Sequence, residues 1–188
     1  MKKILIIFLL FQTTAHSQNL VNTYFAGGCF WCMEESFEKI EGVIEVISGY
    51  SGGTTENPTY KEVTYSDTGH FETIKITYDS EIINYKKILD FYWKNIDPFD
   101  SIGQFCDKGY SYRSVAFYKS IEQKKIIEKS VEDIELKFNK KVVTYIKKFD
   151  KFYEAESYHQ DYYKENFINY LMYKNGCGRE KTLNKIWN

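Results

Sequence analysis

The chain has 188 residues, a formal net charge of -1 at pH 7 and an aromatic fraction of 18%, with 17 tyrosines. This length favours one domain and suffices to bury a hydrophobic core without cross-links, and the aromatic content excludes an intrinsically disordered chain. The nearly balanced charge provides no basic surface for nucleic acid and no strong field for an acidic partner.

The N-terminus has the pattern of a secretory signal. Lys2–Lys3 precede an apolar run over Ile4–Phe11, and Ala15–Ser17 has the small-x-small form of a cleavage site. The apolar run is shorter than the roughly 20 residues that cross a membrane as a helix. Removing residues 1–17 would leave 23 basic and 26 acidic residues, a net charge of -3. We predict a cleaved signal peptide over 1–17, a single domain over 18–188 and an exported, periplasmic or otherwise extracytoplasmic protein, with an uncleaved anchor or a disordered leader as the alternative.

The rest of the chain alternates between strand and helix patterns. We predict strands over 20–26, 43–50, 70–79, 111–118 and 141–149, helices over 29–40, 84–96, 121–138 and 157–173, a loop over 51–60 and an irregular C-terminal tail over 174–188. Gly42 is expected to end the first helix and Ser120 to cap the third. Two consecutive strands and short connections indicate an α+β fold in which helices pack on a two-layer mixed β-sheet.

A cysteine follows two glycines in the stretch AGGCFWCMEESFEKI, residues 26–40. Cys29 stands where the predicted helix begins, and the unpaired N–H groups and partial positive charge of a helix N-terminus favour a thiolate. We therefore predict a lowered pKa for Cys29 and a nucleophilic thiol, with the glycines allowing close approach of a second molecule and with Phe30 and Trp31 partly open. The alternative is a buried cysteine in a packed strand-to-helix corner.

Cys32 lies one helical turn after Cys29, so the two form a candidate dithiol, with a core-filling cysteine as the alternative. The number of cysteines does not distinguish structural disulfides from reactive thiols. A zinc site needs four ligands, usually with a second close pair. No such pair is formed by the remaining candidates, which are His70, Cys106, His159 and Cys177. We therefore expect no metal and no cofactor.

Four ordered blocks of sequence resemble one enzyme family. The blocks are GCFWCMEESFEKIEGVIEVISGYSGG over 28–53, NPTYKEVTYSDTGHFETIKITYD over 57–79, NIDPFDSIGQFCDKGYSYRSVAFY over 95–118 and FYEAESYHQDYY over 152–163. They are similar to blocks of the peptide-methionine (S)-S-oxide reductases, the A-type methionine sulfoxide reductases. The resemblance implies a single catalytic reductase domain over 18–188 with a ferredoxin-like core.

The resemblance also implies a role for each matching side chain. Cys29 would be the nucleophile, Glu72 the acid, and Phe30 and Trp31 the walls that hold the substrate's methyl group. The phenols of Tyr60 and Tyr112 would hydrogen-bond the sulfoxide oxygen, and Asp107 would be a polar supporter of the site. The chemistry agrees with this set, because a sulfoxide needs an attacking thiolate, donors for its oxygen and an acid whose pKa is raised by burial. His70 and His159 are expected to be structural.

The cysteine that resolves the sulfenic acid is less constrained by sequence. We place Cys177 first, because Gly176 and Gly178 would let its thiol move towards Cys29. Cys32 comes second, since one helical turn can satisfy disulfide geometry. Cys106 comes third, because extended backbone would turn it away if Asp107 faces the site.

The implied activity is reduction of methionine-S-sulfoxide, protein-bound or free, through a cysteine sulfenic acid and an intramolecular disulfide. A thioredoxin-like dithiol would recycle the enzyme, which would repair oxidised proteins. We expect a monomer with no nucleic-acid partner and no membrane contact after signal cleavage. Two alternatives remain open: a thiol–disulfide exchange protein that uses Cys29 and Cys32, and a non-catalytic binding module with an aromatic pocket.

Overall fold

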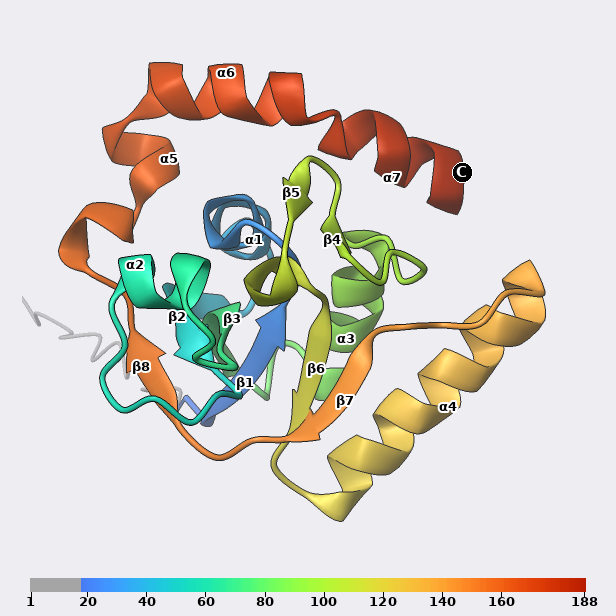
Figure 1. Ribbon diagram of the computed structural model, residues 1–188. Coiled ribbons are helices and arrows are strands. Elements are labelled where there is room, and N and C mark those ends of the chain that lie inside the picture. Colours follow the sequence, from blue (N-terminus) through green and yellow to red (C-terminus); the bar gives the residue numbers. More distant parts are fainter. Residues whose placement is uncertain (1–17) are drawn as a thin grey trace, which may run out of the picture.

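The computed structural model describes residues 18–188, so the predicted signal peptide lies outside the described residues. Within that range, no helix combines the length and the apolar character that crossing a membrane requires. The core follows the order strand, helix, strand, strand, helix, strand (Figure 1). Its elements are β1 (Leu20–Ala26), α1 (Phe30–Phe37), β2 (Val43–Ser51), β3 (Phe71–Asp79), α3 (Tyr85–Lys94) and β6 (Val115–Tyr118).

The sheet has the strand order β7-β6-β1-β3-β2-β8, and its four inner strands form the ferredoxin-like arrangement. β3 runs antiparallel to both β1 and β2, and β6 runs antiparallel to β1. β7 (Tyr145–Lys148) adds a parallel strand beside β6, and β8 (Phe152–Glu154) an antiparallel one beside β2. The predicted α+β class, the mixed sheet and the ferredoxin-like core are confirmed.

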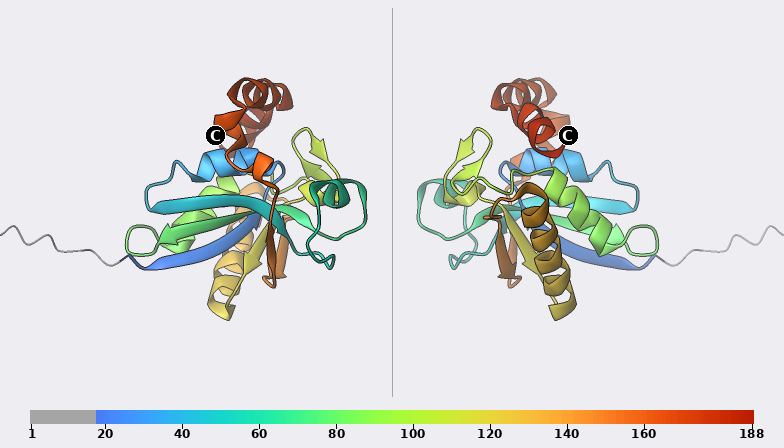
Figure 2. Two further views of the ribbon diagram at one scale, coloured as in Figure 1. Left: turned by 90° about the vertical axis from the view of Figure 1, so that its left-hand side faces the viewer. Right: turned by 90° about the vertical axis from the view of Figure 1, so that its right-hand side faces the viewer.

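The remaining elements surround this core. They are α2 (Tyr60–Tyr65), the hairpin of β4 (Gly103–Gln104) and β5 (Asp107–Lys108), the 3-10 turns η1 (Tyr110–Tyr112) and η2 (Ser157–His159), and the helices α4 (Ile121–Phe138), α5 (Tyr162–Glu165), α6 (Phe167–Cys177) and α7 (Arg179–Trp187). Figure 2 shows α6 and α7 as an outer layer on the side of the sheet that carries α1.

Strand pleating explains why one face of the sheet carries the main core. Phe25, Ile74 and Ile76 point to one side and pack with apolar residues of α1 and α3. Tyr24 and Phe71 point to the other side, where they form a smaller cluster with the partly buried Phe149, after β7, and Phe152, the first residue of β8. Two clusters thus fix the middle strands, and the end of β1 is held rigidly where the site begins.

The predicted irregular tail over 174–188 is wrong, because this segment completes α6 and forms α7. The two helices meet at Gly178, whose φ of +69° suits glycine. Two residues anchor α7 to the rest of the protein. Arg179 is buried, and the indole N–H of Trp187 donates to the carbonyl of Ile96 at 3.1 Å. Such contacts leave no periodic pattern in the sequence, which explains the error.

Two other predictions needed correction. The predicted loop over 51–60 leads into the unpredicted α2, which begins with a capping box between Thr59 and Glu62. The helix predicted over 157–173 is instead three short elements, and Asp161 interrupts it with a φ of +51°. This break turns the chain so that α6 crosses over α1 (Figure 1).

Candidate active site

The turn between β1 and α1 presents Cys29 at the start of α1. Gly28 has a φ of +80°, and a Cβ there would lie 2.6 Å from the Cβ of Gln104, so this position requires glycine. Cys29 is the residue that precedes the first helical turn, and its side chain makes no capping hydrogen bond. The thiol is therefore free to act, although only 5% of the residue is exposed.

The prediction that the pKa of Cys29 falls is wrong. Burial raises the pKa well above its ordinary value, with further increases from the hydrogen bond to Cys32 and the charges of Cys32 and Glu72. The hydrogen bond from Cys29, with the nearby charge of Arg179, outweighs burial at Cys32 and lowers its pKa to about 7. Within this pair the ionisation of Cys32 is therefore favoured over that of Cys29.

Glu72 lies on β3 directly opposite Tyr50 of β2, on the face that α1 covers. Its Oε2 accepts a hydrogen bond from the backbone N–H of Phe30 at 3.0 Å, so the carboxyl sits under the first turn of α1. Only 2% of Glu72 is exposed. Burial raises its pKa well above the ordinary value, against the effect of the Phe30 N–H. Glu72 is therefore an acid that keeps its proton, as a proton donor requires.

The predicted site residues line one small cavity of about 70 Å³. The cavity is walled by Cys29, Phe30, Trp31, Tyr60, Glu72, Asp107 and Tyr112, together with Tyr173. They come from α1, α2, β3, the β4–β5 hairpin, η1 and α6, so the fold brings together segments that are far apart in the chain. A cavity of this size holds only a small group, since one water molecule has a share of about 30 Å³ in the liquid.

Two phenols face each other in this cavity. Tyr60 begins α2 and Tyr112 ends η1, and both line the cavity. Burial raises the pKa of both. Both hydroxyls therefore stay protonated and can donate hydrogen bonds to a substrate oxygen that gains negative charge.

The indole of Trp31 is fixed by its neighbours. Its ring stacks on that of Tyr162 with the centroids 3.8 Å apart, and its N–H donates to Nδ1 of His159 at 3.2 Å. His159 is buried and packs on the ring of Tyr60 at 4.5 Å. These contacts give His159 the structural surroundings that the sequence predicts, and they hold one aromatic wall of the cavity rigid.

His70 is also held by backbone groups. Its Nδ1 accepts from the N–H of Gly53 at 3.2 Å, and its Nε2 lies 2.8 Å from the carbonyl oxygen of Thr55. Neither nitrogen points to the cavity residues. The histidine fixes the loop that leads to α2.

Tyr173 is a cavity residue that the sequence analysis missed. Its hydroxyl donates to Oδ2 of Asp107 at 2.5 Å, and its ring meets Trp31 edge-on at 6.1 Å. The neighbouring phenol of Tyr173 also lowers the pKa of the Cys29 thiol. Burial raises the pKa of Asp107, mainly opposed by the hydrogen bond from Tyr173. The spacing of Tyr170, Tyr173 and Cys177 places them on one face of a helix. This spacing is the feature of the sequence from which Tyr173 could have been predicted to lie near the cysteines.

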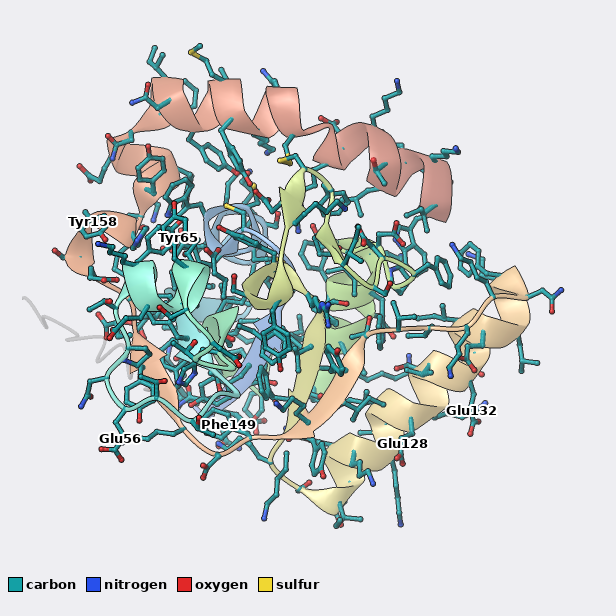
Figure 3. All side chains as sticks on the ribbon, in the orientation of Figure 1. Glu56, Tyr65, Glu128, Glu132, Phe149 and Tyr158 are labelled. Carbon is teal, nitrogen blue, oxygen red and sulfur yellow. A yellow bond between two sulfur atoms is a disulfide. The ribbon has the colours of Figure 1, made fainter. Side chains whose placement is uncertain are left out.

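Two of the four cysteines are joined in a disulfide. Cys177 forms a disulfide with Cys106, which ties the end of α6 to the β4–β5 hairpin (Figure 3). Cys29 and Cys32 are free and buried, and they lie in one cluster. In this state Cys32, rather than Cys177, is the thiol in contact with Cys29.

Two clusters of three potential metal ligands, each with cysteine or carboxylate side chains, occur among the described residues. Cys106, Asp107 and Cys177 lie together, but the disulfide leaves no thiolate to act as a ligand. Glu34, Glu38 and Asp161 form the second group, and Lys164 makes ion pairs with two of its members.

Comparisons with known proteins agree with this site. A family model described as "Peptide methionine sulfoxide reductase" matches residues 21–188. A peptide methionine sulfoxide reductase MsrA of Ligilactobacillus salivarius (strain UCC118) is 50% identical over 166 residues, which cover 87% of this chain and 96% of that protein. One of Listeria monocytogenes serotype 4b (strain F2365) is 47% identical over 172 residues, covering 90% and 97%. The reduced form of Mxr1 from Saccharomyces cerevisiae has a TM-score of 0.73 and 31% identity over 78% of this chain and 86% of that one. This chain therefore belongs to the peptide methionine sulfoxide reductase family.

Proposed function

We propose that the protein reduces the S epimer of methionine sulfoxide, in proteins and as the free amino acid, to methionine. The observation that carries the proposal is the composition of the 70 Å³ cavity: a thiol, a protonated carboxyl, two phenols and two aromatic walls. A methyl sulfoxide is small, has a positive sulfur and a negative oxygen, and matches each of these groups. Family membership supports the same activity.

In the first step, Cys29 attacks the sulfoxide sulfur. The proton of Cys29 passes to the thiolate of Cys32, whose pKa is lowered to about 7, as the sulfur–sulfur bond forms. Glu72 gives its proton to the sulfoxide oxygen, and the hydroxyls of Tyr60 and Tyr112 stabilise the charge on that oxygen. The oxygen then moves to Cys29 as a sulfenic acid, methionine leaves with the electron pair, and Glu72 regains a proton. The net change is one thiol and one sulfoxide converted to one sulfenic acid and one thioether.

We propose that Cys32 resolves the sulfenic acid, which reverses the order expected from sequence. Its thiol contacts Cys29, whereas Cys177 is bonded to Cys106. Attack of Cys32 on the Cys29 sulfur forms a disulfide and releases water. A thioredoxin-like dithiol then reduces this bond by thiol–disulfide exchange. Mxr1 of Saccharomyces cerevisiae, the yeast protein with this fold, was solved in complex with Trx2.

The decisive assay supplies each epimer of a methionine sulfoxide peptide separately, with a dithiol as reductant. We expect methionine from the S epimer only, and none from the Cys29→Ser variant. Cys106→Ser is the matched control, because it also removes one sulfur but leaves the cavity thiols in place. Reduction of the R epimer alone would contradict the proposal, and full activity of Cys29→Ser would favour the binding-module alternative.

A parallel assay tests the other redox alternative. A thiol–disulfide exchange protein would reduce the disulfides of insulin with a dithiol donor, faster than the donor alone. We expect no acceleration, because the acid, the phenols and the aromatic walls beside the thiol match a small sulfoxide and not a protein disulfide. Rapid insulin reduction without turnover of the sulfoxide would favour exchange as the function.

We also propose that the protein is exported and works as a monomer. The support for export is the charged and apolar pattern of residues 1–17, and the oxidising conditions outside the cytoplasm supply oxidised methionine for repair. N-terminal sequencing of the protein from fractionated cells tests the cleavage site. Light scattering during gel filtration tests the monomer.

A further inference from the structure

A second and larger cavity lies away from the catalytic one. It has a volume of about 540 Å³ and is formed by α3, α4 and the end of α7. The helices α3 and α4 lie side by side (Figure 2), and we call the cavity between them the α3–α4 groove. It shares no lining residue with the 70 Å³ cavity. Its volume is within the range of about 300–1,000 Å³ that holds a small organic ligand.

The floor of the α3–α4 groove is apolar. It is formed by Leu89, Trp93, Ile126, Ile134 and Trp187. The indole N–H of Trp93 donates to Oγ of Ser130 at 2.9 Å, and this hydroxyl donates to the carbonyl oxygen of Ile127 at 2.7 Å. The indole N–H of Trp187 donates to the carbonyl oxygen of Ile96. These three donors are satisfied within the protein, so the floor matches an apolar chain rather than a ring with polar edges.

Trp187 closes one end of the groove. Its N–H bonds to Ile96, just beyond the end of α3, and its ring meets that of Phe138 edge-on at 5.3 Å, at the end of α4. The indole thus spans the distance from one helix end to the other. A helix of a partner protein that ran along the groove would collide with Trp187, whereas a flexible chain of limited length can lie within it.

The charged residues of the groove are mostly lysines. Five lysines and two aspartates line it, a formal charge of +3, although residues 18–188 together carry a formal charge of -3. Lys86 pairs with Asp90 at 2.7 Å, and Lys129 pairs with Asp133 at 2.6 Å. The other three are Lys94, Lys125 and Lys137. Among residues 18–188, no carboxylate lies within 4.0 Å of these three ammonium groups. Because apolar walls focus the field of such charges, the groove attracts an anion.

We propose that the α3–α4 groove binds a fatty acid, with the alkyl chain on the apolar floor and the carboxylate at the unpaired lysines. Such a molecule combines the two properties that the groove selects. The ammonium group of Lys137 lies 5.7 Å from the centre of the Trp187 ring, so an unpaired charge borders the floor. The site is independent of the reductase reaction, because the two cavities share no residue, and either proposal can fail without the other.

Isothermal titration calorimetry of the whole protein with dodecanoate, kept below its micelle concentration, tests the proposal. Acetate has the same head without the chain, and dodecyltrimethylammonium has the same chain with a positive head. We expect one dodecanoate bound per protein and no measurable binding of the other two. Absence of dodecanoate binding would overturn the proposal. Equal binding of dodecyltrimethylammonium would also overturn it, because the lysines would then not select the ligand.

Two variants locate the site. Lys94→Gln/Lys125→Gln/Lys137→Gln removes the three unpaired charges and should weaken dodecanoate binding by about three- to a hundredfold, the loss expected for three exposed ion pairs. Ile126→Trp fills the groove without changing its charge and should prevent binding. If Ile126→Trp does not fold, the lysine variant decides, because its three side chains are exposed.

The matched control is Lys61→Gln/Lys148→Gln/Lys151→Gln, which removes three exposed lysines outside the groove. It should keep the wild-type affinity, and an equal loss in both triple variants would overturn the proposal. Two other occupants have signatures of their own. Binding to anionic lipid vesicles without binding of dodecanoate would indicate a membrane surface. A dimer in light scattering that Ile126→Trp dissociates would indicate a second copy of the chain. Either result would contradict the fatty-acid site.

Discussion

The Glu72→Gln substitution should remove the proton donor while leaving the surrounding structure in place. The glutamine side chain can still accept the hydrogen bond from the backbone N–H of Phe30, because one carbonyl oxygen remains. It cannot transfer a proton to the sulfoxide oxygen. General acid catalysis contributes about 10²–10⁴-fold, so the rate of the reduction step should fall by that factor, or about 3–5 kcal/mol.

The pH profile should separate loss of the acid from loss of structure. Burial raises the pKa of Glu72, so the wild-type carboxyl keeps its proton to a higher pH than an ordinary glutamate does. The wild-type rate should therefore fall on the alkaline side, and that limb should be absent in Glu72→Gln. The assay is methionine formed in a single turnover, measured across pH without recycling reductant.

Glu41→Gln is the matched control, because Glu41 is exposed and far from the cavity residues. It should keep the wild-type rate and the wild-type pH profile. A Glu72→Gln enzyme within threefold of the wild type, or one that keeps the alkaline limb, would refute the role of Glu72 as the acid.

Three other changes give distinct expected results. The Tyr60→Phe/Tyr112→Phe double variant should lose at least about 10² in rate, since each change removes a donor to the oxygen, whereas Tyr65→Phe on the exposed side of α2 (Figure 3) should not. Burial raises the pKa of Glu34 to about 7, so the unfolding free energy of the wild type should fall by up to about 3 kcal/mol as the pH rises from 4.5 to 7. In Glu34→Gln this fall should be absent from the unfolding free energies that urea titrations give at the two pH values. Cys106→Ser opens a cross-link of sequence separation 71 and should lower the unfolding free energy by about 4 kcal/mol, a difference that vanishes when the wild type is reduced.

Local patterns predicted most of the core elements. The strand predicted over 20–26 is β1, and the helix predicted after Ser120 ends at Phe138 as expected. In each case the signal lies within the segment: alternating side chains for the strand, and a capping serine with apolar spacing for the helix. The cavity residues were predicted through a resemblance, since a tyrosine or a glutamate alone carries no such information.

The failures share a different cause. The pKa of Cys29 depends on its burial and on the neighbouring Cys32 and Glu72, and the raised pKa follows from the folded surroundings of the thiol. The pairing of Cys177 depends on the position of the β4–β5 hairpin, 71 residues earlier in the chain. Properties that arise from contacts between distant segments cannot be read from one of those segments.

Tyr173 illustrates the same limit. Its spacing relative to Cys177 predicts a shared helix face, but only the path of α6 over α1 shows that this face closes the cavity (Figure 1). The segment over 174–188 has few apolar residues and was predicted to be irregular, whereas Arg179 and Trp187 anchor it as a helix.

Trapping the sulfenic acid tests the central claim most directly. The Cys32→Ser variant, treated with one equivalent of methionine-S-sulfoxide and a sulfenic-acid reagent, should form methionine slowly and carry the reagent on Cys29, as identified by peptide mass spectrometry. Methionine formed with the label on another residue, or with no labelled cysteine, would contradict the account of Cys29 as the atom that takes the oxygen.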